Sequence, residues 1–308
     1  MTRTNFYSGG GLDRAELLRR DPAWITLAIR TGRLRLVPVW RNHNLISNPE
    51  APRPLFLDSL DQMERLLASG HEPFLLGHRE EVTFAALDLS QYDNPSDVTV
   101  IEALGEANFE DLRRVGPLLD RWEGSLLAYA RGLCWWHQRH GYCGVCGSPT
   151  RSENAGHQRR CTNEGCGALH FPRTDPAVIM LVHDGERCVL GRQQAWPSGM
   201  HSTLAGFVEP GESLEEAVAR EVFEEVGLAV SDVVYHSSQP WPFPSSIMLG
   251  FFARTNEHTL KIDPNELESA AWFTRDELLN APEDDTLRLP RRDSIARHLV
   301  TSWLNDDF

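Results

Sequence analysis

Three glutamates, Glu221, Glu224 and Glu225, lie at positions i, i+3 and i+4 of a segment with helical periodicity, Ser213–Val226. Side chains at this spacing share one side of an α-helix, so three carboxylates meet within a single turn. Like charges at this spacing repel one another mildly, whereas a hard divalent cation binds carboxylate oxygens readily. The spacing therefore predicts a divalent-cation site, although the usual explanation of an acidic helix face is plain solvation.

The segment that carries the glutamates has recognisable ends. Ser213 followed by Glu216 forms a capping box, and Gly227 is typical of a helix C-terminus. The apolar residues of the segment recur at helical spacing and predict one buried face: Leu214, Ala217, Val218 and Val222.

Four cysteines form a second candidate metal site. They are arranged as Cys143-x2-Cys146 and Cys161-x4-Cys166, with fourteen residues between the pairs. Two thiolate pairs separated by a hairpin-sized gap suit tetrahedral Zn²⁺, and four protein ligands leave no position open for catalysis. We therefore expect structural zinc. Disulfide bonds are the alternative, and an expected cytoplasmic location disfavours them.

Composition and charge limit the function. The 308 residues are 41% hydrophobic and 24% charged, which is typical of a globular protein of two or three domains. The formal net charge of -14 argues against a protein that mainly grips a phosphate backbone. No run approaches the ~18 apolar residues of a membrane helix, and the start has no signal-peptide pattern. We expect a cytoplasmic protein with no membrane partner.

The pattern of short elements predicts an α+β protein with three domains. These are an N-terminal α+β domain (1–140), a zinc ribbon (141–172) and a C-terminal layered α/β/α sandwich (173–308). In the first, Trp24–Arg30, Leu34–Trp40 and Val82–Leu87 are expected as strands. Asp58–Ala68 is expected as a helix, and Phe109–His140 as a helix interrupted near Gly116-Pro117.

In the third domain, Ala177–His183 and Cys188–Arg192 are expected to form a hairpin around Asp184-Gly185. Three further strands are expected near Val230–Ser237, Ile247–Arg254 and Ala270–Phe273, and a closing helix over Arg291–Leu304.

The acidic segment, from Gly206 to Leu228, follows the pattern G-x5-E-x7-R-E-U-x-E-E-x-G-U, where U is aliphatic. Every position is met, and the segment resembles the Nudix box. The resemblance implies a loop–helix–loop that holds Mg²⁺ or Mn²⁺ and hydrolyses a nucleoside diphosphate linked to another group. It also implies that Arg220 orients the glutamates by ion pairing and does not touch the substrate.

A proline-rich motif, Ser238-Gln-Pro-Trp-Pro-Phe-Pro-Ser-Ser246, follows the box. Alternate prolines cannot form a helix and predict a stiff extended loop that holds Trp241 and Phe243 in fixed directions. Such a pair suits stacking on a flat ring, although a proline-rich turn with its aromatics in the core is an equal alternative. The motif resembles the signature of NADH pyrophosphatases, a Nudix subfamily that includes bacterial enzymes removing NAD caps from RNA. The resemblance extends from about Cys143 to the C-terminus.

The resemblance also implies roles for single residues. The metal ligands would be Glu221, Glu225, Glu266 and the Ala205 carbonyl, with Glu224 completing the acidic cluster. Glu225 or Glu224 would help remove a proton from the attacking water.

For the substrate, the resemblance implies that Phe207 stacks on nicotinamide and that Trp241 covers the other face from the second protomer of a homodimer. Phe171 stands where some relatives have Tyr. The second cysteine pair of this chain has x4 spacing, whereas some members of the subfamily have x2. The remaining residues expected to line the pocket are Gln239, Pro240, Pro242, Phe243, Pro244, Ser245, Ser246 and Ala296.

The expected activity is metal-dependent hydrolysis of NAD(H) to NMN(H) and AMP, and of NAD-capped RNA to NMN and 5′-monophosphate RNA. One alternative is a broader dinucleotide or ADP-ribose pyrophosphatase. The other is a non-catalytic zinc-ribbon module that binds nucleic acid. For that module, Arg151, Arg159 and Arg160 are either contacts to nucleic acid or solvated charges on a turn.

Overall fold

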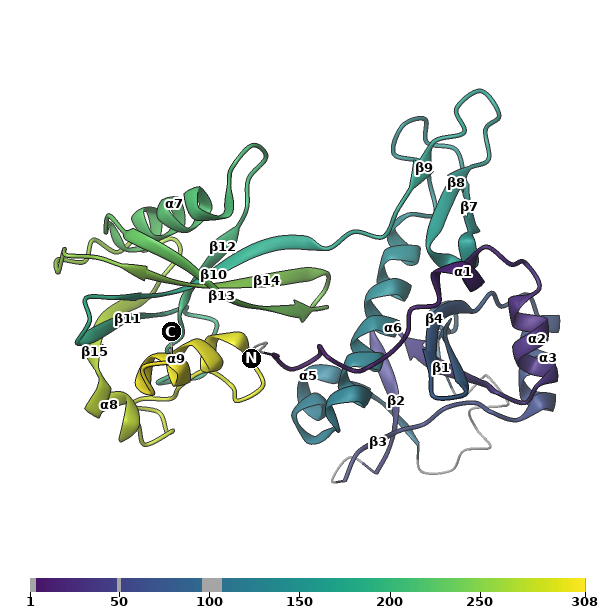
Figure 1. The fold of residues 1–308 in the computed structure, drawn as a ribbon, viewed down its shortest axis with the longest axis horizontal. Helices are drawn as coiled ribbons and strands as arrows, with labels where there is room; N and C mark the ends of the chain where they lie inside the picture. Colours follow the sequence, from purple (N-terminus) through teal and green to yellow (C-terminus); the bar gives the residue numbers. More distant parts are fainter. Residues whose placement is uncertain (1–3, 49–50, 96–106, 308) are drawn as a thin grey trace. The chain divides into compact units, whose positions relative to one another are not determined.

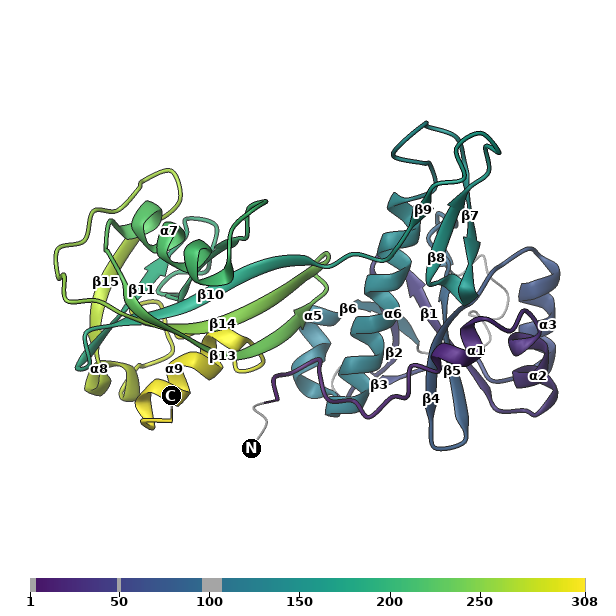
Figure 2. The same ribbon diagram turned by 45° about the horizontal axis from the view of Figure 1, so that its top comes forward.

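The computed structural model describes residues 4–48, 51–95 and 107–307, and the chain divides into two compact units (Figures 1 and 2). The C-terminal unit comprises Asp175–Trp241, Ser246–Phe308 and the first residues, Met1–Ser8. The N-terminal unit comprises Gly9–Thr174 and the short segment Pro242–Ser245. Each unit is described separately below.

The C-terminal unit is built on a mixed sheet with the order β13-β14-β10-β11-β15, and β12 pairs with β10. The β10–β14 pair is parallel, and the other strand pairs of this sheet are antiparallel. The strands are β10 (Asp175–His183), β11 (Arg187–Arg192), β12 (Leu204–Phe207), β13 (Ser231–Trp241), β14 (Ser246–Arg254) and β15 (Ser269–Thr274).

Helices cover both faces of this sheet, as Figure 1 shows. Side chains of β10 alternate between the faces: Val178 and Met180 pack with α7 (Leu214–Val226), whereas Ile179 and Leu181 pack with α8 (Arg275–Leu279) and α9 (Ile295–Leu304). This period of two is what a strand buried on both faces requires. The expected α/β/α sandwich is confirmed, including its predicted hairpin.

Helix α7 has the predicted ends. The Ser213 hydroxyl accepts the Glu216 N–H at 3.2 Å, and the Glu216 carboxylate accepts the Ser213 N–H at 2.7 Å. Gly227 ends the helix in the left-handed region, with φ of 70°. Ala217, Val218 and Val222 are fully buried, and Leu214 is partly buried against the same core, so the predicted apolar stripe is confirmed.

The proline-rich motif differs from the expected loop. Strand β13 continues through its first half, with Pro240 paired to Ile247 and Trp241 to Ser246 of β14. Because β13 is an edge strand, a proline without an N–H is tolerated there. The alternating prolines are therefore compatible with a hairpin, whose turn residues Pro242–Ser245 are counted with the N-terminal unit.

The N-terminal unit contains a second mixed sheet, with the order β3-β2-β1-β5-β4 and β6 paired to β2. Its elements are α1 (Glu16–Arg19), α2 (Trp24–Arg30), β1 (Leu34–Trp40), β2 (His43–Ser47), β3 (Arg53–Pro54), α3 (Leu60–Ala68), β4 (Phe74–Arg79), β5 (Val82–Asp88), β6 (Asn108–Asp111), α5 (Leu112–Val115), η2 (Gly116–Leu118) and α6 (Arg121–Arg139).

Two predictions in this unit were wrong, the first as a whole and the second in part. Trp24–Arg30 is helix α2 and not a strand. Its buried residues, Trp24 and Ala28, are four positions apart, and residues at that spacing share one face in a helix and also in a strand. A short apolar run therefore does not distinguish the two structures. Residues from Phe109 to Asp111 belong to strand β6, so helix begins only at Leu112. The predicted interruption at Gly116-Pro117 is confirmed by the 3-10 turn η2.

The cysteine-rich segment forms a small three-stranded sheet with the order β7-β8-β9. Its elements are β7 (Thr150–Glu153), η3 (Asn154–Gly156), β8 (Gln158–Cys161) and β9 (Leu169–His170). Across the part of the chain that the structure describes, no helix is long and apolar enough to cross a membrane.

Because the capping box fixes the first turn of α7, we expect Ser213→Ala to destabilise the protein by about 1 kcal/mol. That loss corresponds to a fall in Tm of about 2–4 °C for a domain of this size. The control is Ser198→Ala, at an exposed position between β11 and β12. Equal melting temperatures of the two variants would contradict a stabilising role of the box.

Candidate active site

Three carboxylates converge beside the second half of α7. Oxygen atoms of Glu221, Glu225 and Glu266 all lie within 4.8 Å of one another. Glu221 is 8% exposed and Glu225 is 3% exposed, whereas Glu266 is exposed. Two buried carboxylates and a third at the surface thus share one small volume, which is the ligand type that hard divalent cations prefer.

Backbone hydrogen bonds place Glu266 next to the helix. The Lys261 N–H donates to the Val226 carbonyl at 2.8 Å, and the Asp263 N–H donates to the Glu225 carbonyl at 3.1 Å. Leu267, directly after Glu266, is buried in the core beneath α7. The loop is therefore held at both sides of Glu266, and the free carbonyls of the helix C-terminus are satisfied.

Burial and mutual repulsion make this cluster costly without a cation. Burial, reinforced by the charges of Glu221 and Glu266, raises the pKa of Glu225 to about 8. Burial also raises the pKa of Glu221, although Arg220 opposes that shift. Glu225 Oε2 is buried and has no hydrogen-bond partner among the residues that the structure describes. This unpaired oxygen and the oxygen-only donor set fit a divalent cation.

Gly206 explains the first position of the acidic pattern. A Cβ placed there would lie 1.8 Å from Glu221 Cδ, so only glycine allows β12 to pass so close to this carboxylate. Gly206 is paired with Val178 of β10, which fixes the strand in that place.

Arg220 holds several parts of the site together. Its guanidinium donates to Glu212 Oε1 at 2.6 Å, to Glu221 Oε1 at 2.8 Å and to the Phe207 carbonyl at 2.9 Å. The bond from Arg220 also lowers the pKa of Glu212 to about 2. Arg220 thus links the loop before α7 and the end of β12 to a carboxylate of the cluster, consistent with an orienting role.

Glu224 does not join this group, in contrast to the expectation from the sequence. Successive helical residues are about 100° apart, so Glu225 lies about 40° to one side of Glu221 and Glu224 about 60° to the other. The Glu224 side chain is 50% exposed and pairs with Arg220 Nη1 at 2.9 Å. Glu224 and Glu225, at i+3 and i+4 from Glu221, therefore have different surroundings although both lie near it on the helix surface.

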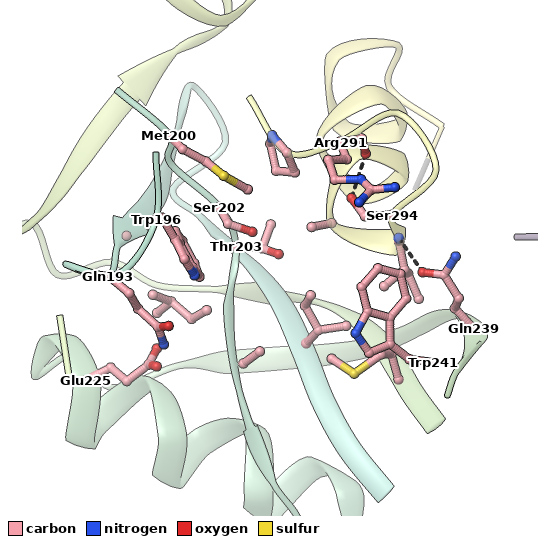
Figure 3. A pocket seen from close by; sticks show the side chains of 18 of the residues that line it. Gln193, Trp196, Met200, Ser202, Thr203, Glu225, Gln239, Trp241, Arg291 and Ser294 are labelled. Atoms are coloured by element: carbon pink, nitrogen blue, oxygen red, sulfur yellow. Dashed lines mark hydrogen bonds between the residues drawn. The ribbon is translucent and has the colours of Figure 1, made fainter. Parts of the chain in front are cut away.

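A pocket of about 310 Å³ opens beside the carboxylates, and Figure 3 shows Glu225 at one side of it and Trp241 at another. Five residues expected in the site from the sequence line this pocket: Ala205, Glu225, Gln239, Trp241 and Ala296. Several lining residues lie outside both motifs and were not predicted, among them Gln193, Trp196, Met200, Thr203 and Arg291. In the sequence, only the aromatic ring of Trp196 could have drawn attention.

The Gln239 side chain is held in place by hydrogen bonds within the protein. It is fully buried, donates to the Asp293 carbonyl at 2.7 Å and accepts the Ile295 N–H at 2.7 Å. The amide therefore joins β13 to the first turn of α9. Tyr7, which the sequence did not indicate, is buried and packs edge-on against Trp241 with 6.2 Å between ring centroids.

Several other residues expected in the site do not line this pocket. Phe207 is 61% exposed and is not among the residues that line the pocket. Pro240 and Ser246 belong to the β13–β14 pair.

Phe243 and Phe171 belong to the N-terminal unit. There, Arg131 donates to the Pro242 carbonyl at 2.7 Å, and its guanidinium lies 4.8 Å from the centroid of the Phe243 ring. Pro244 and Ser245 complete the same turn, and Phe171 is exposed.

The four cysteines of the ribbon also converge. All four sulfurs lie within 4.8 Å of one another, and none is in a disulfide. The Cys143–Cys166 and Cys146–Cys161 sulfur pairs are 3.9 and 3.4 Å apart. Bonds of ~2.3 Å in a tetrahedral site imply sulfurs roughly 3.8 Å apart, so the arrangement fits zinc.

The arginines of the ribbon are occupied by protein partners. Arg151 and Arg160 both pair with Glu153, at 3.0 and 2.9 Å. Arg159 donates to the Thr150 carbonyl at 2.8 Å and lies 2.8 Å from His137 Nδ1. These contacts favour a structural role over a surface for nucleic acid.

Three protein-family models match consecutive segments of the chain. The NUDIX domain model matches residues 173–296, and the NADH pyrophosphatase zinc ribbon model matches 138–171. A third model, the NADH pyrophosphatase-like rudimentary NUDIX domain, matches 34–136, where the sequence showed no motif. The chain belongs to the Nudix family. The three matches follow one another along most of this Nudix chain.

Curated relatives include the NAD-capped RNA hydrolase NUDT12 of Macaca fascicularis, which is 44% identical over 193 residues, covering 59% of this chain and 42% of that protein. The NAD-capped RNA hydrolase NudC of Mycobacterium bovis is 46% identical over 203 residues, covering 63% of this chain and 64% of that protein. The Nudix chain thus spans less than two thirds of each of these two relatives.

Among solved structures, a NUDIX hydrolase from Nitrosomonas europaea matches 54% of this chain and 90% of that chain, with a TM-score of 0.44 and 20% identity.

We expect the ribbon to bind one zinc ion that requires all four cysteines. Cys146→Ser should lose that ion, because three ligands bind zinc far more weakly than four. Native mass spectrometry of the whole protein measures this. Cys134→Ala, which changes a buried cysteine outside the ribbon, should keep the ion. Retention of zinc by Cys146→Ser would contradict the assignment.

Glu225→Gln should stabilise the metal-free protein at pH 8 and should abolish the stabilisation that added metal gives. In the metal-free protein, Glu225 keeps its proton up to about pH 8, whereas in the unfolded chain it ionises near 4.5. The folded wild type therefore loses stability as pH rises from about 4.5 to 8, and the neutral variant does not. We expect the variant to melt with the wild type at pH 4.5 and a few degrees above it at pH 8.

Addition of Mn²⁺ at pH 8 should raise the Tm of the wild type and leave that of Glu225→Gln unchanged. Glu224→Gln is the matched control, since it alters the neighbouring carboxylate outside the cluster, and it should respond to Mn²⁺ as the wild type does. A response to Mn²⁺ lost in Glu224→Gln and kept in Glu225→Gln would be incompatible with the cluster described.

Proposed function

We propose that this Nudix chain is a divalent-metal-dependent diphosphatase that hydrolyses NAD(H) to NMN(H) and AMP. The observation that carries the proposal is the convergence of Glu221, Glu225 and Glu266 beside a pocket lined by Trp196 and Trp241. A cation site next to an aromatic pocket suits a substrate with a charged diphosphate and a flat ring. The names of the curated relatives support a substrate that contains NAD.

In this proposal, Glu221, Glu225, Glu266 and the Ala205 carbonyl hold Mg²⁺ or Mn²⁺. Bound there, the cations would supply positive charge for the diphosphate oxygens and acidify a water molecule. Without them, each pair of like charges near 4 Å opposes binding by about 1–4 kcal/mol, depending on exposure to water. An absolute requirement for a divalent cation follows.

The chain itself would position the reactants and accept a proton. Glu225 Oε2, buried and without a partner among the described residues, is our choice for the atom that takes the proton of the attacking water. In the metal-free protein Glu225 keeps its proton up to about pH 8, and a cation bound at the cluster would lower that pKa so that the carboxylate can accept a proton. Arg220 keeps Glu221 in place through its 2.8 Å bond and does not contact the substrate.

NAD-capped RNA is the second proposed substrate, because it presents the same NAD moiety to the pocket. Its cleavage would give NMN and 5′-monophosphate RNA. Support comes from the names of the relatives and not from the ribbon arginines, which have protein partners. We also propose a homodimer in which Trp241 is shared across the interface, and a division into domains at residues 1–140, 141–172 and 173–308.

Turnover of NADH tests the proposal. Glu225→Gln and Glu221→Gln should lower kcat on the order of 10²-fold or more at saturating Mg²⁺, since both lie in the cluster. The kcat of Glu224→Gln should fall much less, because the Glu224 carboxylate lies outside the cluster. Mass spectrometry of the products should show NMNH and AMP, and not a nicotinamide or phosphate product.

Near-wild-type turnover in both cluster variants would refute the proposed machinery. ADP-ribose and a diadenosine polyphosphate, measured beside NADH, separate the proposal from its broader alternative. Equal kcat/KM on all three would replace the NAD-specific diphosphatase with a general pyrophosphatase.

A further inference from the structure

The first described residues of the chain, Thr4–Ser8, belong to the C-terminal unit, although the whole segment Gly9–Thr174 separates them from β10 along the chain. Asn5 is 4% exposed and Tyr7 is 2% exposed, so this unit encloses both side chains. Figure 1 shows the segment beginning beside α9. All three matching family models begin later in the chain. The C-terminal unit thus includes a segment that lies outside every matched domain.

The buried Asn5 side chain joins two elements of this unit. Its Nδ2 donates to Ser237 Oγ at 2.9 Å and to the Ser238 carbonyl at 2.8 Å, both on β13. Its Oδ1 lies 2.5 Å from His298 Nδ1, on α9. Buried polar groups whose bonds are all made restrict the elements that carry them to one arrangement. Asn5 therefore fixes β13 and α9 relative to each other.

A second set of bonds leads from the segment to the residues that precede α9. The Tyr7 hydroxyl donates to Asp293 Oδ2 at 3.3 Å. The Gln239 amide donates to the Phe6 carbonyl at 3.3 Å and to the Asp293 carbonyl at 2.7 Å. The Asp293 side chain, which is 2% exposed, also accepts bonds of 3.0 and 2.9 Å from Arg291. The segment is thus bonded to Asp293 directly through Tyr7 and indirectly through Gln239.

These bonds end at one wall of the pocket. The Ile295 N–H, in the first turn of α9, donates to Gln239 Oε1 at 2.7 Å, and Figure 3 shows this bond. The route from the segment to the wall does not pass through Trp241, so it is the same whether or not Trp241 is shared across a dimer interface. The residues at the start of α9 or shortly before it that line the pocket are Arg291, Ser294, Ile295 and Ala296.

We propose that Asn5 and Tyr7 are positioning residues for substrate binding, which hold the start of α9 in the arrangement that the substrate requires. Neither side chain is among those that line the pocket, so both act through Gln239, Asp293 and His298. The segment then determines how tightly the substrate binds and leaves the carboxylate cluster unchanged. The choice of NADH as the substrate rests on the proposed function.

Steady-state kinetics on NADH, with the full chain at saturating Mg²⁺, test the positioning role. When only a fraction of the molecules has the binding arrangement, the apparent affinity falls by that fraction. The loss of one hydrogen bond corresponds to a factor of roughly 2 to 12. We therefore expect Asn5→Ala and Tyr7→Phe to raise KM by about that factor and to leave kcat unchanged, because the cluster that does the chemistry is intact.

Hydrogen–deuterium exchange, followed by mass spectrometry, reads the same effect without turnover. The amides of residues 290–298 should exchange faster in both variants, and those of α7 should exchange as in the wild type, because the opening is local. Asn44→Ala is the matched control, since it removes a fully buried amide from β2 of the N-terminal unit. It should leave both KM and the exchange at 290–298 unchanged.

An unchanged KM in both segment variants, or unchanged exchange at 290–298, would overturn the proposal. An equal rise of KM in Asn44→Ala would overturn it as well, because the effect would then be a general loss of stability. If Asn5→Ala does not fold, Tyr7→Phe, which keeps the ring and loses only the hydroxyl, decides alone. A wild-type chain that does not hydrolyse NADH would refute the proposed function, and the exchange measurement would still decide whether the segment positions α9.

Discussion

The structure of the site depends on one unfavourable interaction, the confinement of Glu221, Glu225 and Glu266 within 4.8 Å of one another. Two of these carboxylates are buried, so both desolvation and repulsion oppose their ionisation. At an effective dielectric constant near 20, each charged pair at 4 Å costs about 4 kcal/mol. A protein keeps such a cluster when a bound cation reverses the sign of the interaction.

The surrounding elements all restrict how far these carboxylates can separate. The capping box fixes the start of α7, Gly206 lets β12 pass against Glu221, and Arg220 joins the preceding loop to the same carboxylate. The loop bearing Glu266 is tied to the carbonyl groups of Glu225 and Val226. Relaxation by moving apart is thereby limited, and the site is organised before any cation binds.

Local patterns predicted much of this arrangement from the sequence. The ends of α7, the β10–β11 hairpin and the cysteine cluster follow from short-range spacing, and all three are confirmed. Spacing could not separate Glu224 from Glu225, because burial depends on what packs against each side of the helix. Trp196 and Thr203 were missed for a related reason, because residues distant in the chain bring them to the pocket. Tyr7 was missed because it packs against Trp241 from more than 200 residues away in the chain. The prediction for Trp24–Arg30 was wrong because so short an apolar run fits the period of a strand as well as that of a helix.

The most direct test of the central claim is to locate the cation. Crystals of the whole protein soaked with Mn²⁺ and measured for anomalous scattering would show where manganese binds. The account predicts anomalous density bounded by carboxylate oxygens of Glu221, Glu225 and Glu266, with the Glu224 carboxylate still on Arg220. Density at Glu224 and Glu212 instead, or none at the cluster at millimolar Mn²⁺, would contradict it.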